Sequence, residues 1–140
     1  MSTLKNSSKL KILKLVLLFL LVILLDQVTK FWFSQNLVLT INTGFSFGMI
    51  NNLPVVVISA LQIFFLLVVV GLIRLKKIDE YQAIIILAAG SSNLIDRWIF
   101  SGVRDIFYLP VLNLTNNLAD WLIFLTIIVW IFNNFKQEFK

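Results

Sequence analysis

This chain of 140 residues contains no cysteine and no histidine, two residue types on which many enzymes depend. The lack of cysteine excludes a disulfide, a thiol nucleophile and a thiolate metal site. The lack of histidine excludes a Ser-His triad and imidazole metal ligands. No metal or organic cofactor is implied, and any acid–base chemistry has to come from other side chains.

Charge is also scarce. Charged residues make up 14% of the chain and hydrophobic residues 59%, with a mean hydropathy of +0.94. A soluble domain is roughly half apolar and a quarter charged, so the composition indicates an integral membrane protein. The length fits a single domain over residues 1–140. The net charge of +5 could indicate nucleic-acid binding, but most charges flank apolar runs, so we expect no nucleic-acid partner.

The apolar runs predict an all-α bundle of four transmembrane helices, because a bilayer core needs about 20 apolar residues per crossing. We expect these helices at residues 12–33, 54–73, 82–100 and 118–135. The first run follows several lysines, as in a secretory signal peptide, but no small-residue cleavage site follows it. It is therefore predicted to remain in the protein as a membrane helix.

Basic residues predict how the helices are oriented. With both termini in the cytoplasm, nine basic residues lie on that side and three on the other. The nine are Lys5, Lys9, Lys11, Lys14, Arg74, Lys76, Lys77, Lys136 and Lys140, and the three are Lys30, Arg97 and Arg104. Cytoplasmic loops of membrane proteins carry an excess of Lys and Arg, so both termini are predicted to be cytoplasmic.

The first outer connection, residues 34–53, contains no charged residue. Its segment from Asn36 to Asn42 alternates loosely between polar and apolar residues, as a short strand does. Gly44 and Gly48 follow this segment. The pattern predicts a small β-structure on the outer membrane surface, and a plain connecting loop is the alternative.

Two acids, Asp105 and Asp120, flank the connection between the third and fourth helices. Both are predicted at the outer membrane face, and the residues between them can turn back so that the carboxylates meet. Adjacent carboxylates cannot both ionise, which favours a shared proton and activation of a water molecule. The alternative is a loop with one solvated acid and one acid that starts a helix, since Asn or Asp is favoured as the cap where residues 117–120 open the fourth helix.

Other polar residues stand near the same face. Asn93, Asp96 and Arg97 share one side of the third helix, a combination that is unusual in a membrane helix and usually functional. Tight packing with a capped helix end is the alternative. Asp26 and Lys30 lie one turn apart at the outer end of the first helix, where an exposed ion pair of little energetic value is the alternative.

In order along the chain, five short motifs resemble those of lipoprotein signal peptidase (signal peptidase II), a family of four-helix aspartic peptidases of bacterial inner membranes. The motifs are Asp26-Gln27 with Lys30 for D-Q-x-x-K, Asn42-x-Gly44 with Phe47 for N-x-G-x-x-F, Asn93 to Arg97 for N-x-x-D-R, Val103-x-Asp105 for V-x-D, and Asn117-x-Ala119-Asp120 for N-x-A-D. Each motif is weak alone, but all five occur at the matching helix ends.

The resemblance implies an aspartic endopeptidase with Asp105 and Asp120 as its catalytic pair. Its substrates would be prolipoproteins, cut before a cysteine that carries a diacylglyceryl group. A small extracytoplasmic β-cradle in the first outer loop would hold them, and the enzyme would be a monomer among membrane lipids. The residues implied to bind substrate or to support the site are Asp26, Lys30, Asn42, Gly44, Asn93, Asp96, Arg97 and Asn117.

The chain departs from the family pattern at three places. Phe45-Ser46 follows the loop glycine, where small residues are usual. Residues 88–92 read Ala-Ala-Gly-Ser-Ser in place of a glycine-rich run, and Asn116 replaces a Phe. These changes affect substrate fit and helix packing more than the chemical step.

Two other functions compete with the peptidase. A non-catalytic membrane binding or scaffold protein with the same fold would tolerate loss of either aspartate, and both are present. A proton or ion pathway would place its acids at mid-bilayer depth, whereas the acids here are predicted at one face.

Overall fold

The computed structural model describes residues 2–36, 39–44, 53–111 and 114–138. Four helices make up most of this part of the chain. They are α1 (Ser2–Asn36), α2 (Val55–Arg74), α3 (Glu80–Phe100) and α4 (Leu118–Glu138). All four are long and apolar enough to cross a membrane, which confirms the predicted four-helix membrane fold.

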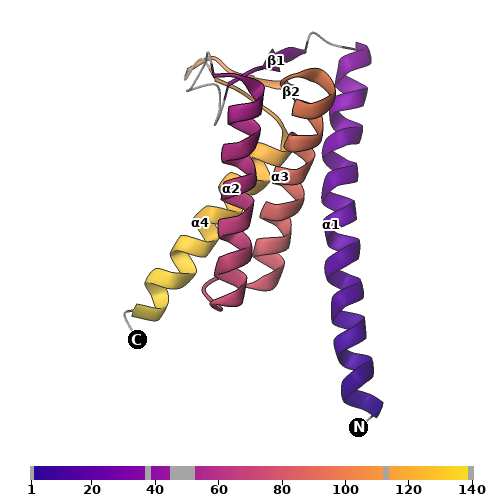
Figure 1. The fold of residues 1–140 in the computed structure, drawn as a ribbon, viewed down its shortest axis with the longest axis vertical. Coiled ribbons are helices and arrows are strands. Elements are labelled where there is room, and N and C mark those ends of the chain that lie inside the picture. The colour runs from indigo at the N-terminus through magenta and orange to yellow at the C-terminus, as the bar shows by residue number, and fades with distance from the viewer. Residues whose placement is uncertain (1, 37–38, 45–52, 112–113, 139–140) are drawn as a thin grey trace.

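The helix α3 is the centre of the bundle, because it packs against each of the other three helices. In Figure 1, α1 runs along one side of α3, and α2 and α4 lie on its other side. Small residues make these contacts possible: Ala88 and Ala89 of α3 pack with Val22 of α1 and Ala119 of α4 in one buried cluster. The second cluster joins α2 to α3 around Val69. Small side chains let helix backbones approach closely in lipid.

The first helix is longer than predicted in both directions. It begins at Ser2, well before residue 12, because lysine and leucine are good helix formers and no proline interrupts them. It continues through residues 34–36, so the predicted start of the outer loop at residue 34 was wrong. No glycine or proline stands at these positions to stop the helix. At about 1.5 Å per residue, α1 is considerably longer than a bilayer core is thick.

The other helix ends follow local capping. Pro54 takes the N-cap position of α2. The α3 helix starts two residues before the predicted residue 82, because the Asp79 carboxylate accepts hydrogen bonds from the backbone N–H groups of Tyr81 and Gln82, at 2.9 and 3.3 Å. It ends at Phe100, and the C-cap residue Ser101 adopts a left-handed conformation with φ of 57°.

Two small antiparallel sheets lie at one end of the bundle. Strand β1 (Thr40–Asn42) pairs with β2 (Val103–Asp105), and β3 (Phe107–Leu109) pairs with β4 (Leu114–Asn116). The predicted β-structure of the first outer connection is therefore present, but its partner strand comes from beyond α3. The predicted features at Phe45, Ser46, Phe47 and Gly48 lie outside the described residues.

The pairing of β1 with β2 depends on close contact at Gly102. A Cβ atom added there would lie 2.6 Å from Ile41 Cγ2 and 3.0 Å from the Asn42 carbonyl oxygen. The register places Thr40 opposite Asp105. We call the end of the bundle that carries β1 and β2 the sheet end; both described chain ends lie toward the opposite end in Figure 1.

Candidate active site

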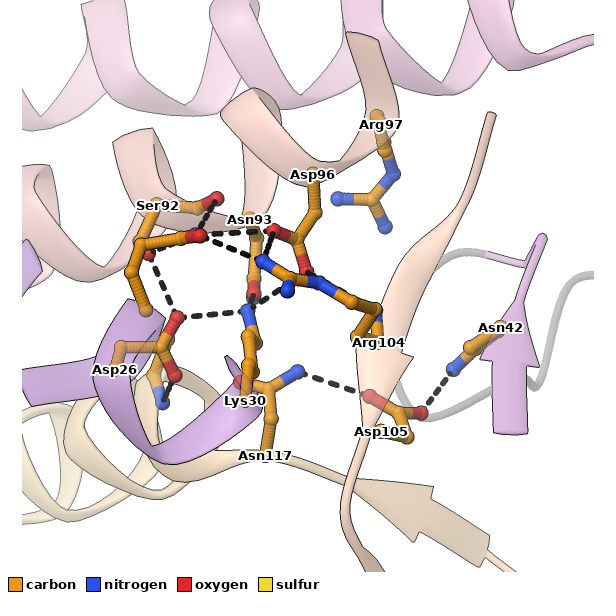
Figure 2. Close-up of polar contacts among 12 residues, drawn as sticks. Asp26, Lys30, Asn42, Ser92, Asn93, Asp96, Arg97, Arg104, Asp105 and Asn117 are labelled. Carbon is orange, nitrogen blue, oxygen red and sulfur yellow. Dashed lines mark hydrogen bonds and ion pairs between the residues drawn. The ribbon is translucent and has the colours of Figure 1, made fainter. Parts of the chain in front are cut away.

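Asp105, at the end of β2, is one of the buried acids of the sheet end. Its side chain is only 2% exposed. One oxygen accepts hydrogen bonds from Asn42 Nδ2 at 2.9 Å and Thr115 Oγ1 at 2.7 Å. The other accepts from Asn117 Nδ2 at 2.9 Å. These donors come from β1, from β4 and from the residue before α4, so three segments fix this carboxylate. Figure 2 shows the hydrogen bonds from Asn42 and Asn117.

Asp120 lies in the first turn of α4 and is only partly buried. Its Oδ1 accepts a hydrogen bond from Asn93 Nδ2 at 2.8 Å. Its backbone N–H donates to Asn117 Oδ1 at 3.1 Å. The side chain of Asn117 thus contacts both acidic residues, donating to the Asp105 carboxylate and accepting from the Asp120 backbone.

The capping interpretation of Asp120 does not describe this helix end. Asn117 is the residue that caps α4, since its side-chain oxygen accepts the N–H three residues on. Among the described residues, Asn93 is the only side chain that donates to Asp120. In the part of the chain that the structure describes, no side chain donates to its second carboxylate oxygen.

Lys30 and Asp26 form a buried ion pair rather than the exposed pair that was the alternative. Both side chains are fully buried, with Lys30 Nζ 2.7 Å from Asp26 Oδ2. Lys30 also contacts Asp96 Oδ2 at 3.2 Å and donates to Asn93 Oδ1 at 2.8 Å. The ammonium thus contacts three oxygen atoms, and two of them belong to carboxylates.

Asp26 also joins three helices. Its Oδ2 accepts from Ser92 Oγ of α3 at 2.7 Å, and its Oδ1 accepts from the Ala119 backbone N–H of α4 at 2.9 Å. This second bond satisfies one of the N–H groups that the start of a helix leaves without an intrahelical partner. The acid of α1 therefore fixes the start of α4, one residue before Asp120.

Asp96 holds β2 against the end of α3. Its oxygens accept from the Arg104 backbone N–H at 3.0 Å and from Arg104 Nη2 at 2.8 Å. The guanidinium also donates to Gln27 Oε1 at 2.6 Å and lies 4.3 Å from the centre of the Phe100 ring. Arg104 neighbours Asp105, so this ion pair also positions that acid.

Arg97 is turned toward a different set of partners. It donates through Nη1 to Gln62 Oε1 of α2 and through Nη2 to the Gly44 carbonyl at 3.2 Å. Its charge lies within electrostatic range of both Asp105 and Asp120. The prediction that Asn93, Asp96 and Arg97 share one face is correct, but each of the three serves a different part of the site.

All the site residues expected from the sequence belong to this network. Those that the sequence analysis did not assign are Gln27, Gln62, Ser92, Arg104 and Thr115. A signal was available for Gln62, since an amide in an otherwise apolar run has to find a partner in the bundle. Arg104 was counted only as an outer basic residue, and Thr115 has no sequence signal of its own. Within the described ranges, no group of three or more acids is placed to hold a metal ion.

The fold and the network define a class: a membrane protein with four spanning helices and a buried polar site at one end of the bundle. The family model for Signal peptidase (SPase) II matches residues 18–136, so the chain belongs to the signal peptidase II family. It is accordingly a protease that crosses the bacterial inner membrane several times.

Individual relatives agree. The chain is 30% identical to a lipoprotein signal peptidase from Thermodesulfovibrio yellowstonii, over 91% of this chain and 99% of that one. Two solved structures, each described as a bacterial membrane enzyme, share its fold at 19% identity. One has a TM-score of 0.73 and covers 89% of both chains. The other has a TM-score of 0.65 and covers 86% of this chain and 91% of its own.

Proposed function

We propose that this protein is an intramembrane aspartic endopeptidase that removes signal peptides from diacylglyceryl-modified prolipoproteins, cutting before the lipidated cysteine. Lipoprotein processing is the activity of its family. The observation that carries the aspartic mechanism is the position of Asn117, whose single side chain contacts both Asp105 and Asp120. In a chain without histidine or cysteine, these paired acids are the groups available to activate water.

The charges of the network support one shared proton between the two acids. Three cations are present, namely Lys30, Arg97 and Arg104, against four carboxylates. With one proton on the Asp105–Asp120 pair, the buried charges balance, which lowers the cost of placing them beside a membrane core. We place that proton on Asp120, since Asp105 already accepts three hydrogen bonds that a carboxylate satisfies best.

The reaction follows from this assignment. The ionised Asp105 takes a proton from a water molecule as the water oxygen bonds to the scissile carbonyl carbon. Asp120 gives its proton to the carbonyl oxygen, so that a neutral tetrahedral diol forms. Collapse of the diol re-forms the carbonyl, and the proton on Asp105 passes to the leaving nitrogen. As the C–N bond breaks, the hydroxyl group that becomes the carbonyl returns its proton to Asp120, and the other hydroxyl stays in the carboxyl product.

The remaining residues would hold the acids and the substrate. Asn93 and Arg97 would bind the substrate backbone beside the pair, since Asn93 contacts Asp120 directly and Arg97 carries a positive charge near both acids. Asn42 and Asn117 orient Asp105 by direct hydrogen bonds, and Gly44 anchors Arg97. Asp26, Lys30 and Asp96 would support the site through the ion-pair network without contacting the reacting atoms.

The orientation of the site is part of the proposal. The charge distribution supports cytoplasmic termini, and the two chain ends lie away from the sheet end (Figure 1). The acids would then lie at the extracytoplasmic face, where the cleavage site of an exported lipoprotein emerges.

The test is cleavage of a reporter prolipoprotein by the purified protein in detergent, followed by mass spectrometry of both products. We expect a cut directly before the cysteine in the diacylglyceryl form and none in the same reporter without lipid. Binding of the lipidated reporter with no cleavage would favour the scaffold alternative and contradict the peptidase.

A further inference from the structure

The helix α2 carries one amide side chain that the reaction described above does not use. Gln62 is 5% exposed and stands in an apolar run of that helix. Its Nε2 donates to the Gly90 carbonyl of α3 at 2.5 Å. Its Oε1 accepts from the Arg97 guanidinium. Both ends of the amide therefore have partners on the neighbouring helix, which offsets the cost of burying a polar group next to lipid.

The contact depends on close approach of α2 and α3. A Cβ atom at Gly90 would lie 2.6 Å from Leu66 Cδ2, and Leu66 is one turn beyond Gln62. The lack of a side chain at position 90 lets Leu66 pack against the α3 backbone. The same approach brings the Gln62 amide within hydrogen-bonding distance of the Gly90 carbonyl.

Arg97 continues the contact toward the sheet end. Its Nη2 donates to the Gly44 carbonyl at 3.2 Å. The Gly44 N–H donates to Asn42 Oδ1 at 2.9 Å, and Asn42 Nδ2 donates to Asp105 Oδ2 at 2.9 Å. A continuous series of hydrogen bonds thus connects α2 to the buried acid. This series, the α2 relay, consists of Gly90, Gln62, Arg97, Gly44, Asn42 and Asp105.

In the α2 relay, the orientation of each side chain depends on the hydrogen bond that precedes it. The long Arg97 side chain has many rotamers. The hydrogen bond from Nη1 to Gln62 restricts them and leaves Nη2 directed at the Gly44 carbonyl. The Asn42 oxygen accepts from the Gly44 N–H while Nδ2 donates to Asp105, so the two hydrogen bonds together favour one orientation of the amide. Loss of the acceptor at Gln62 therefore loosens β1 and its hydrogen bond to Asp105.

We propose that Gln62 is a positioning residue of the peptidase, which acts through Arg97 and β1 to orient Asp105. The expected fall in kcat rests on the proposed function, whereas the expected loosening of β1 does not. The helix α2, which supplies no other residue to the site described above, would thereby take part in setting the reaction rate.

The activity test uses Gln62→Leu, which keeps the volume and removes both hydrogen bonds. Its matched control is Ser59→Ala, on the same helix, since the Ser59 hydroxyl is buried and has no hydrogen-bond partner among the described residues. We expect Gln62→Leu to lower kcat about 10- to 100-fold, the equivalent of one lost hydrogen bond to a charged group, and Ser59→Ala to leave it unchanged. Gln62→Met is the second variant should Gln62→Leu not fold.

A double-mutant cycle separates positioning from simple destabilisation. Asn42→Ala breaks the α2 relay at its far end, so adding Gln62→Leu to Asn42→Ala should cost little further activity. Losses that multiply, or that follow a fall in the melting temperature of each variant, would show that Gln62 serves stability alone.

A spin label gives a reading that does not depend on activity. The chain has no native cysteine, so Thr40→Cys places a single nitroxide at an exposed position of β1. We expect Gln62→Leu to increase the mobility of this label in its electron paramagnetic resonance spectrum and Ser59→Ala not to. Equal label mobility in Gln62→Leu and Ser59→Ala would overturn the positioning role of Gln62, even if the wild type cleaves lipoproteins. A clear increase in label mobility in Gln62→Leu alone would support that role, even if the wild type does not cleave them.

Discussion

Single charged residues of the site are paired across elements, and Lys30 is the clearest case. Its ammonium is fully buried and contacts two carboxylates, those of Asp26 and Asp96. Removing one partner of a buried ion pair leaves the other charges without compensation, which is strongly destabilising. Lys30 therefore stabilises the fold as well as the site.

Lys30→Met keeps most of the side-chain volume but removes the charge. We expect the free energy of unfolding in detergent micelles to fall by about 3–5 kcal/mol, because Asp26 and Asp96 lose their shared cation. Denaturant titration followed by tryptophan fluorescence measures this change.

The matched control is Lys11→Met, on the same helix. Lys11 pairs with Glu80 at 2.8 Å, but both side chains are about half exposed. Exposed ion pairs contribute little, so this variant should unfold almost as the wild type does. Equal effects of the two substitutions would contradict the importance of the buried network.

At the scale of elements, the pairing of β1 with β2 brings Asn42 to Asp105. Gly102 makes this pairing possible, since a Cβ there would meet the Asn42 carbonyl at 3.0 Å. Gly102→Ala should therefore displace β1 and lower kcat by at least about tenfold, through the lost hydrogen bond to Asp105. A kinetic assay with the lipidated reporter measures the effect.

Gly71→Ala is the control for this substitution. Within the described ranges, no atom beyond the helix backbone lies within 4 Å of a Cβ built at Gly71, and alanine favours a helix. We expect wild-type activity from this variant. If Gly102→Ala also showed wild-type activity, the catalytic rate would not depend on the position of β1.

The sequence was sufficient to predict the helices but not all their ends or the strand pairing. Apolar runs of the right length are nearly sufficient to identify membrane helices, because few other backbone conformations satisfy their own hydrogen bonds in lipid. The extension of α1 through residues 34–36 has no comparable signal, since polar residues there are compatible with helix or loop. The partner of β1 lies more than 60 residues away, and alternation within Thr40–Asn42 carries no information about it.

Within the site, motifs predicted which residues gather but not what each one contacts. Asn93 and Arg97 were grouped by helical spacing, yet one bonds Asp120 and the other Gln62 and Gly44. The role of Arg104 follows from the turn after α3 that brings its backbone and guanidinium to Asp96. Such contacts depend on three-dimensional packing, which a one-dimensional pattern does not encode.

For the whole molecule, the orientation in the membrane determines which compartment the acids serve. Nine basic residues on one side against three on the other predict a cytoplasmic carboxyl terminus. A reporter active only in the cytoplasm, fused after Lys140, should therefore be active, and alkaline phosphatase fused there should be inactive. The reverse result would place the sheet end in the cytoplasm and contradict processing of exported lipoproteins.

The central claim is that Asp105 and Asp120 act as one unit on the peptide bond. The most direct measurement compares cleavage of a diacylglyceryl prolipoprotein by wild type, Asp105→Asn, Asp120→Asn and the double mutant. Each single substitution should lower kcat by about 10²–10⁴-fold, and the double mutant should be little worse, because residues that work as a unit have non-additive effects.

Asp79→Asn is the control in this measurement, since asparagine caps a helix as well as aspartate and Asp79 caps α3 away from the site. It should retain wild-type turnover, and all four variants should remain folded in detergent. Substantial turnover by either Asp105→Asn or Asp120→Asn would contradict the paired-aspartate mechanism.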